Sequence, residues 1–151
     1  MEKIFKIDAI KFSLTCGLIL FGLIAKSQNR NDTLQIKDAA LNYVEGFYNA
    51  DTLRMKKAIH PELVKRIVMK GENGFSMIKN MGATELIYAT SKYKKTESDK
   101  PFIATVNIYD ISSGIASIKV VTNKFTFIDY LQMAKINNEW KILNVLWAFN
   151  I

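Results

Sequence analysis

The feature that most constrains the fold is a run of four strand-like segments in the last third of the chain. Apolar residues in these segments alternate with polar ones or run continuously, and short polar turns separate the segments, which is typical of β-strands. The segments cover Phe102 to Asp110, Ile115 to Thr122, Phe125 to Ile136 and Trp140 to the end. Because strands joined by short turns pair antiparallel, we predict an antiparallel meander here.

The residues before this run carry helical periodicity. One apolar helix face is formed by Ile36, Ala40, Tyr43 and Phe47. We predict that Asp32 caps the start of this helix and that Asp51 caps a second, shorter helix over Thr52 to Ile59. Pro61 ends the second helix, because the residue before a proline is disfavoured in helical geometry. A third helix is predicted to begin at Gly82-Ala83-Thr84-Glu85.

A predicted β-hairpin lies between the second and third helices. Leu63 to Lys70 alternates as a strand does, and Asn73-Gly74 can supply the positive φ angles of a tight turn before Phe75 to Ile78. Helices at the start and a meander at the end predict an α+β fold. In this fold the N-terminal helices pack in the concave face of a curved, mainly antiparallel sheet.

Five segments, taken in order, resemble a known family. They are Tyr43 to Asp51, His60-Pro61, Gly114 to Val120, Phe127 to Leu131 and Glu139 to Asn144. They are similar to the putative lumazine-binding family of the nuclear transport factor 2-like superfamily, a cystatin-like α+β cone, from about Ile36 to the C-terminus. The resemblance implies this fold and a homodimer. It implies no single activity, because the superfamily includes isomerases, dehydratases, polyketide cyclases and binding modules.

The N-terminal segment is predicted to be a secretory signal peptide. Three lysines precede an apolar run from Phe12 to Ala25, and a small residue follows at Ser27. An uncleaved anchor and a lipoprotein signal are the alternatives. However, the run is short of the roughly 20 residues of a spanning helix, and Cys16 lies inside it rather than at its end. We expect cleavage near Ser27-Gln28, a short polar spacer over 28–33 and one domain over 34–151.

The predicted signal implies a secreted or periplasmic protein that meets a membrane only if the signal stays uncleaved. One His and one Cys in the whole chain exclude an internal disulfide and any multi-His or four-Cys metal site. The formal charge is +7, but the basic residues occur as short pairs, and no phosphate loop, zinc spacing or dinucleotide fingerprint accompanies them. We expect no cofactor, no metal and no nucleic-acid partner.

Two titratable residues are candidates for chemistry. Asp129 lies on an apolar face of its strand, where it is either a general base or an acceptor that holds neighbouring groups together. His60 precedes Pro61 at a helix-to-strand corner. It either pairs with Asp129 as an acid and base or satisfies a local turn.

Aromatic residues supply a candidate pocket, although the same residues are also suited to an ordinary core. The predicted ligand pocket consists of Tyr43, Phe47, His60, Phe127, Asp129 and Trp147, with Tyr48 as a further aromatic candidate. In the last strand, one face is predicted to carry Trp140, Ile142, Asn144 and Leu146, and the other Lys141, Leu143, Val145, Trp147 and Phe149. Apolar residues on both faces predict that helices cover one face and a second subunit the other, which favours a homodimer through the sheet.

Three functions remain open. The first hypothesis is an exported binding or accessory domain for a small hydrophobic or aromatic ligand. The alternative is an isomerase-like or cyclase-like enzyme in which Asp129 or His60 transfers a proton on a bound ring compound. A third possibility, a structural dimer with a filled cone, would have no cavity. Convergence of His60, Asp129 and a tyrosine hydroxyl in one cavity would favour the enzyme.

Overall fold

The computed structural model describes residues 30–71, 74–95 and 100–149. The chain divides into two units, Met1–Leu34 and Gln35–Ile151. Of the first unit only residues 30–34 are described, and all of these are helical. The predicted signal peptide over 1–27 therefore lies outside the described residues, and the predicted spacer is helical from residue 30 onward. Within the described ranges, no helix has the length and apolar character needed to cross a membrane.

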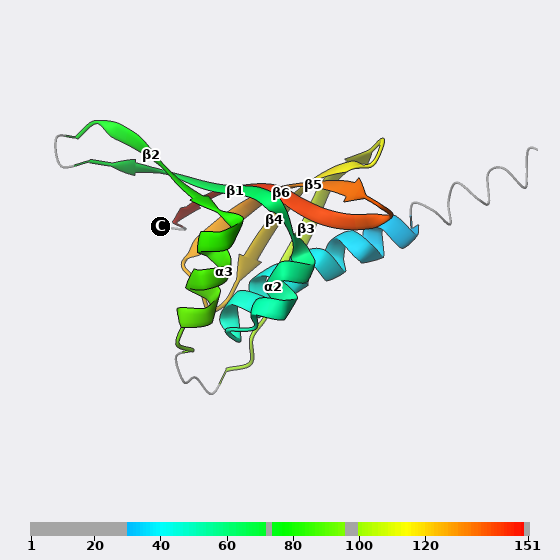
Figure 1. The fold of residues 1–151 in the computed structure, drawn as a ribbon, viewed down its shortest axis with the longest axis horizontal. Helices are drawn as coiled ribbons and strands as arrows, with labels where there is room; N and C mark the ends of the chain where they lie inside the picture. Colours follow the sequence, from blue (N-terminus) through cyan, green and yellow to red (C-terminus); the bar gives the residue numbers. More distant parts are fainter. Residues whose placement is uncertain (1–29, 72–73, 96–99, 150–151) are drawn as a thin grey trace, which may run out of the picture. The chain divides into compact units, whose positions relative to one another are not determined.

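The second unit is a six-stranded sheet with helices on one of its sides (Figure 1). The strands lie in the order β2-β1-β6-β5-β4-β3, and all neighbours are antiparallel except β1 and β6, which are parallel. The helices are residues 35–48, α2 (Thr52–Ala58) and α3 (Ala83–Lys92); the strands are β1 (Ile59–Lys70), β2 (Ser76–Gly82), β3 (Ala104–Ser112), β4 (Ile115–Thr122), β5 (Phe127–Ile136) and β6 (Glu139–Phe149). The predicted α+β architecture with its antiparallel meander is confirmed.

The two predicted helix caps have different outcomes. The carboxylate of Asp51 accepts hydrogen bonds from the backbone nitrogens of Leu53 and Arg54, each at 3.0 Å, so this cap of α2 is confirmed. The cap predicted at Asp32 is wrong, because Arg30 and Asn31 are already helical. The backbone N–H groups without a partner in the helix lie in its first turn, and the N-cap residue comes before that turn. Asp32 follows two helical residues, so it is not the N-cap.

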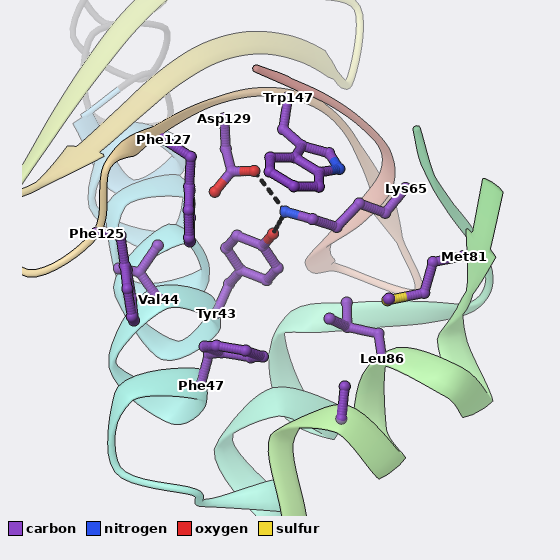
Figure 2. A pocket seen from close by; sticks show the side chains of 11 residues that line it. Tyr43, Val44, Phe47, Lys65, Met81, Leu86, Phe125, Phe127, Asp129 and Trp147 are labelled. Atoms are coloured by element: carbon purple, nitrogen blue, oxygen red, sulfur yellow. Dashed lines mark hydrogen bonds and ion pairs between the residues drawn. The ribbon is translucent and has the colours of Figure 1, made fainter. Parts of the chain in front are cut away.

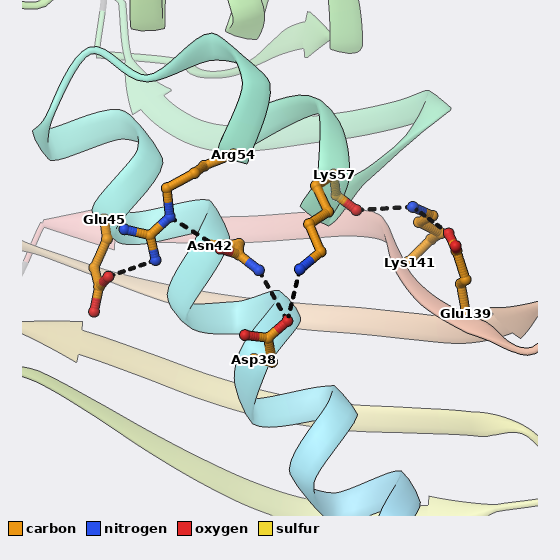
Figure 3. Close-up of polar contacts among 7 residues, drawn as sticks. All are labelled: Asp38, Asn42, Glu45, Arg54, Lys57, Glu139 and Lys141. Atoms are coloured by element: carbon orange, nitrogen blue, oxygen red, sulfur yellow. Dashed lines mark hydrogen bonds and ion pairs between the residues drawn. The ribbon is translucent and has the colours of Figure 1, made fainter.

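Polar side chains and a close approach fix α2 against the first helix. Arg54 of α2 donates from Nε to the Asn42 side-chain oxygen at 2.9 Å and pairs with Glu45 (Figure 3). The two helices lie close together at Gly46, where an added Cβ would lie 3.0 Å from the backbone nitrogen of Met55. A larger residue at this position would push the two helices apart.

The predicted hairpin and the third helix are both present. β1 and β2 pair antiparallel, and Gly74 in the connection has a φ of +79°, which a glycine adopts without strain. β2 continues to Gly82, and α3 follows directly. The Glu85 carboxylate accepts a hydrogen bond from the Gly82 backbone nitrogen at 3.0 Å, which satisfies one of the free N–H groups at the start of α3.

A bulge in β6 changes which of its side chains face the core. Gln132 of β5 pairs with Asn144, but the next residue, Met133, pairs with Ile142, so Leu143 is an extra residue in β6. Our single alternation for the last strand was therefore wrong, because an inserted residue reverses the faces beyond it. Asn144 and Leu146 lie on the outer face of the sheet, and the inward residues are Trp140, Ile142, Val145 and Trp147.

Candidate functional site

A cavity of about 200 Å³ lies between the helices and the inner face of the sheet (Figure 2). Its side chains come from the first helix, α3, β1, β2, β5 and β6, and from the segment just before β5. The lining residues are Tyr43, Val44, Phe47, Lys65, Met81, Leu86, Ala89, Phe125, Phe127, Asp129 and Trp147. Almost all of the wall is carbon, so the few polar atoms define where a ligand's polar group would bind.

Those polar atoms belong to a cluster of three side chains from three different elements. The Lys65 ammonium of β1 donates to Oδ1 of Asp129 on β5 at 2.6 Å and to the hydroxyl of Tyr43 on the first helix at 2.7 Å (Figure 2). Lys65 is 8% exposed, Asp129 1% and Tyr43 3%. Lys65, Asp129 and Tyr43 therefore form a buried, hydrogen-bonded group at the cavity wall.

Burial opposes ionisation of each member of this cluster. Desolvation raises the pKa of Asp129, although the ammonium of Lys65 and hydrogen bonds from Lys65 and Tyr43 lower it. Desolvation also lowers the pKa of Lys65, against the opposite effect of the Asp129 carboxylate. Burial and the nearby carboxylate raise the pKa of Tyr43 well above its usual value, so Tyr43 is a neutral phenol. The cluster carries no net charge, whether the shared proton lies on Lys65 or on Asp129.

Aromatic rings surround the Lys65 nitrogen. Nζ lies 5.4 Å from the ring centroid of Tyr43, 5.3 Å from that of Phe127 and 5.0 Å from that of Trp147. A cation at these distances is attracted by the negative faces of the rings, which partly offsets its loss of hydration. Phe125 continues this aromatic wall, because its ring stacks on Phe127 at 4.7 Å.

The structure brings together most of the side chains that the sequence analysis placed in the pocket. Tyr43, Phe47, Phe127, Asp129 and Trp147 all line the cavity. The core interpretation of the aromatic residues also holds in part, since Tyr43 is 3% exposed and packs in the main hydrophobic cluster. These residues therefore serve as both core and cavity wall.

His60 and Tyr48 are placed elsewhere. His60 is absent from the described lining residues, and its Nδ1 accepts a hydrogen bond from the Glu62 backbone nitrogen at 3.2 Å. This is the local-turn alternative, and the pairing of His60 with Asp129 is not formed, because the ion-pair partner of Asp129 is Lys65. Tyr48 is also absent from the lining, and it stacks on Phe102 at 4.6 Å.

Lys65 is the functional candidate that the sequence analysis missed. It follows Leu63 and precedes Ile67 in the alternation of β1, so a charged side chain lies on an apolar strand face, as Asp129 does on β5. The same criterion that selected Asp129 would have selected Lys65. A lysine in a strand usually extends to solvent. Because Lys65 and Arg66 are adjacent, each face of β1 carries one basic residue, and the alternation alone does not say which face is exposed.

Comparison with known proteins assigns the chain to a family. A family model described as putative lumazine-binding matches residues 31–148, which is most of the sequence. The chain belongs to the putative lumazine-binding family. The match includes every element that lines the cavity, and it confirms the family resemblance of the five segments. No curated protein matches the chain.

Solved structures similar to this member of the putative lumazine-binding family support the fold. An NTF2-like protein of unknown function from Shewanella baltica OS155 has a TM-score of 0.63 and 18% identity, over 78% of this chain and 93% of that one. One from Silicibacter pomeroyi DSS-3 has a TM-score of 0.65 and 13% identity, over 80% and 98%. A putative scytalone dehydratase from Novosphingobium aromaticivorans DSM 12444 has a TM-score of 0.59 and 10% identity, over 83% and 89%. At these identities the likeness concerns the fold alone, which is NTF2-like.

The cavity of this family member offers one ammonium and one carboxyl group, from Lys65 and Asp129. An ammonium has three N–H bonds, and two oxygen acceptors are found for Lys65 among the described residues. An acceptor atom on a ligand would be a third partner for this ammonium. Among the described residues that line the cavity, Asp129 is the only acid. The described parts of the chain contain no group of three or more His, Cys, Asp or Glu that could hold a metal ion.

Proposed function

We propose that this protein is an exported binding domain for a small, neutral, aromatic ligand that carries a hydrogen-bond acceptor such as a carbonyl oxygen. The observation that carries the proposal is the single polar cluster of Tyr43, Lys65 and Asp129 in an otherwise apolar cavity. Membership of a family named for ligand binding supports it. Export rests on the N-terminal signal pattern of the sequence.

Cavity size and wall chemistry support a single-ring ligand. The volume of about 200 Å³ is below the roughly 300 Å³ at which ordinary small-molecule sites begin, and above the roughly 150 Å³ of an engineered apolar cavity that holds benzene. Phe47, Phe127 and Trp147 present ring faces or edges to this space. Offset-stacked and edge-to-face contacts with these rings would favour an aromatic ligand over an aliphatic one of the same size.

Charge balance supports a neutral ligand. The ammonium of Lys65 is already paired with the Asp129 carboxylate at 2.6 Å. A ligand carboxylate at the third N–H of Lys65 would place a second anion close to Asp129 in a site that excludes water, where like charges repel strongly. A carbonyl, ester or ether oxygen accepts the same hydrogen bond without this repulsion.

The enzymatic alternative is an isomerase-like or cyclase-like proton transfer that now depends on Asp129 alone. The distance of 2.6 Å to Lys65 commits Oδ1 of Asp129 to an ion pair, which weakens the carboxylate as a base for substrate. We therefore propose binding as the primary role. Conversion of a bound ring compound during prolonged incubation with the protein would favour the alternative.

We also propose a homodimer through the outer face of the sheet. Tyr130 of β5 and Leu146 of β6 pair across the strands on this face, and they are 46% and 55% exposed. Tyr109 of β3, itself exposed, stacks on Tyr130 at a centroid distance of 6.4 Å. A second copy of the chain would cover this aromatic and aliphatic surface.

The binding proposal is tested by calorimetric titration with a matched pair of ligands, methyl benzoate and benzoate. Both are single-ring compounds of similar size, but only benzoate is an anion at neutral pH. We expect saturable binding of methyl benzoate and binding of benzoate that is about tenfold weaker or more. Lys65→Met should weaken the binding of methyl benzoate, whereas the exposed-lysine control Lys56→Met should not. Tighter binding of benzoate, or no effect of Lys65→Met, would refute the proposed role of the cluster.

A further inference from the structure

Lys65 is the only amine among the described residues that line the cavity. Ligand binding alone makes no use of an amine's ability to act as a nucleophile. Its Nζ projects into the aromatic part of the cavity (Figure 2). A lysine amine in an apolar pocket is a nucleophile toward carbonyl compounds once it has lost its proton.

The neighbours of Lys65 can exchange the protons that such a reaction needs. Asp129 lies 2.6 Å from Nζ and can take a proton from the ammonium, and the Tyr43 hydroxyl lies 2.7 Å away on another side. Burial favours this exchange, because desolvation raises the pKa of Asp129 and lowers that of Lys65. The neutral amine and carboxylic acid together carry the same net charge as the ion pair, so the exchange leaves no uncompensated charge in the cavity.

We propose that Lys65 condenses with small aromatic aldehydes or ketones to form an imine in the cavity. This inference rests on the proposed binding function, and it names the ligand's acceptor group as a reactive carbonyl. It adds covalent capture to the domain's role.

The proposed step balances without any further reagent. Lys65 passes a proton to Asp129, and Nζ then forms a bond to the carbonyl carbon while the carbon-oxygen π bond breaks. A proton moves from nitrogen to oxygen and gives a carbinolamine. Asp129 returns its proton to the hydroxyl group, the carbon-oxygen bond breaks, and water leaves. The products are a protonated imine, the Asp129 carboxylate and one water molecule, with no change in oxidation state.

The surroundings that hold the ammonium would also hold this product. The protonated imine keeps one positive charge at Nζ, next to the Asp129 carboxylate and near the rings of Phe127 and Trp147. Its ring substituent would occupy the apolar part of the cavity. The cavity therefore offers charge pairing and apolar contact to the imine at the same time.

Reductive trapping tests the proposal. The protein is incubated at neutral pH with benzaldehyde and sodium cyanoborohydride, which reduces an imine to a stable secondary amine. We expect an intact mass increased by one benzyl group and peptide mapping that places most of the label on Lys65. Label spread evenly over the exposed lysines, with no preference for Lys65, would overturn the proposal.

Variants separate a chemical role from a structural one. Lys65→Arg keeps the positive charge but removes the nucleophilic amine, so the preferred label should be lost, while Lys56→Met should retain it. If Lys65→Arg does not fold, Lys65→Met combined with Asp129→Asn removes the amine together with its buried counter-charge and should lose the label in the same way. Saturable binding of methyl benzoate without labelling of Lys65 by benzaldehyde would refute imine formation and leave the binding function standing. Loss of both would refute both.

Discussion

Replacing Lys65 with methionine leaves the carboxylate of Asp129 buried without its cation. Asp129 is 1% exposed and Lys65 is 8% exposed, so solvent would not compensate for the loss of the pair. Tyr43 remains as a neutral hydrogen-bonding neighbour, but it cannot neutralise the charge. The variant therefore isolates the cost of an unpaired anion in this cavity.

The expected loss of stability is large for one substitution. Removing one partner of a buried ion pair costs about 3–5 kcal/mol. For a domain of this size, the melting temperature falls by about 4 °C for each kcal/mol, so Lys65→Met should lower it by about 12–20 °C. Lys65→Met combined with Asp129→Asn removes both charges and should recover most of this loss, because no uncompensated charge remains.

The measurement is urea unfolding of the wild type, the two single variants and the double variant, followed by tryptophan fluorescence or circular dichroism. The coupling free energy of the Lys65 and Asp129 substitutions is obtained from the four unfolding free energies. A Lys65→Met cost below about 1 kcal/mol, typical of an exposed pair, would refute the description of this pair as buried. A double variant as unstable as Lys65→Met would show that the cost does not come from the charge of Asp129.

The same variants should differ in their dependence on pH. In the wild type, the ammonium of Lys65 lowers the pKa of Asp129 against the effect of burial, so Lys65→Met should raise that pKa further. A carboxyl whose folded pKa is raised contributes stability below its unfolded pKa of about 3.9 and loses it as the pH rises through the folded pKa. The cost of Lys65→Met should therefore grow from about pH 4 toward neutral pH, and the variant that also contains Asp129→Asn should lack this dependence.

Three further substitutions test the fold and the proposed dimer. Asp51→Ala should cost about 1 kcal/mol in urea unfolding by removing the cap of α2, and no measurable cost would contradict the cap. Gly46→Val should cost about 1–3 kcal/mol in the same assay, because a Cβ would lie 3.0 Å from the Met55 nitrogen; an unchanged midpoint would show that the helices separate freely. Tyr130→Glu should convert a dimer to a monomer in sedimentation, whereas Leu53→Glu, at an exposed site on α2, should not. A monomeric wild type would refute the dimer.

Much of the fold follows from local patterns in the sequence. The alternation of β5 placed Asp129 on an apolar strand face, and in the structure Asp129 and Leu131 are buried while Tyr130 is exposed. The position of Asn144 on the outer face of β6 could not be predicted from alternation. It results from the bulge at Leu143, which depends on how β5 and β6 pair rather than on the residues of β6 alone.

The candidate site was only partly predictable for a related reason. Asp129 could be identified as a charged group on an apolar face, but its partner depends on which strands and helices converge. β1 and β5 are not neighbours in the sheet, since β6 lies between them. The contact between Lys65 and Asp129 therefore cannot be predicted from hairpins or other pairs of adjacent strands. His60 was a reasonable alternative by residue type, but the backbone of Glu62 satisfies it locally.

Binding of a small neutral aromatic compound against Lys65 can be followed directly by the fluorescence of a tryptophan in the cavity wall. Trp147 lines the cavity, and the chain has only one other tryptophan, Trp140, so Trp140→Phe leaves Trp147 as the sole indole reporter. Titrating this variant with methyl benzoate should change the Trp147 emission in a saturable way, and adding Lys65→Met should weaken or abolish the response. A response that does not saturate, or one that benzoate produces at lower concentration than methyl benzoate, would contradict the account.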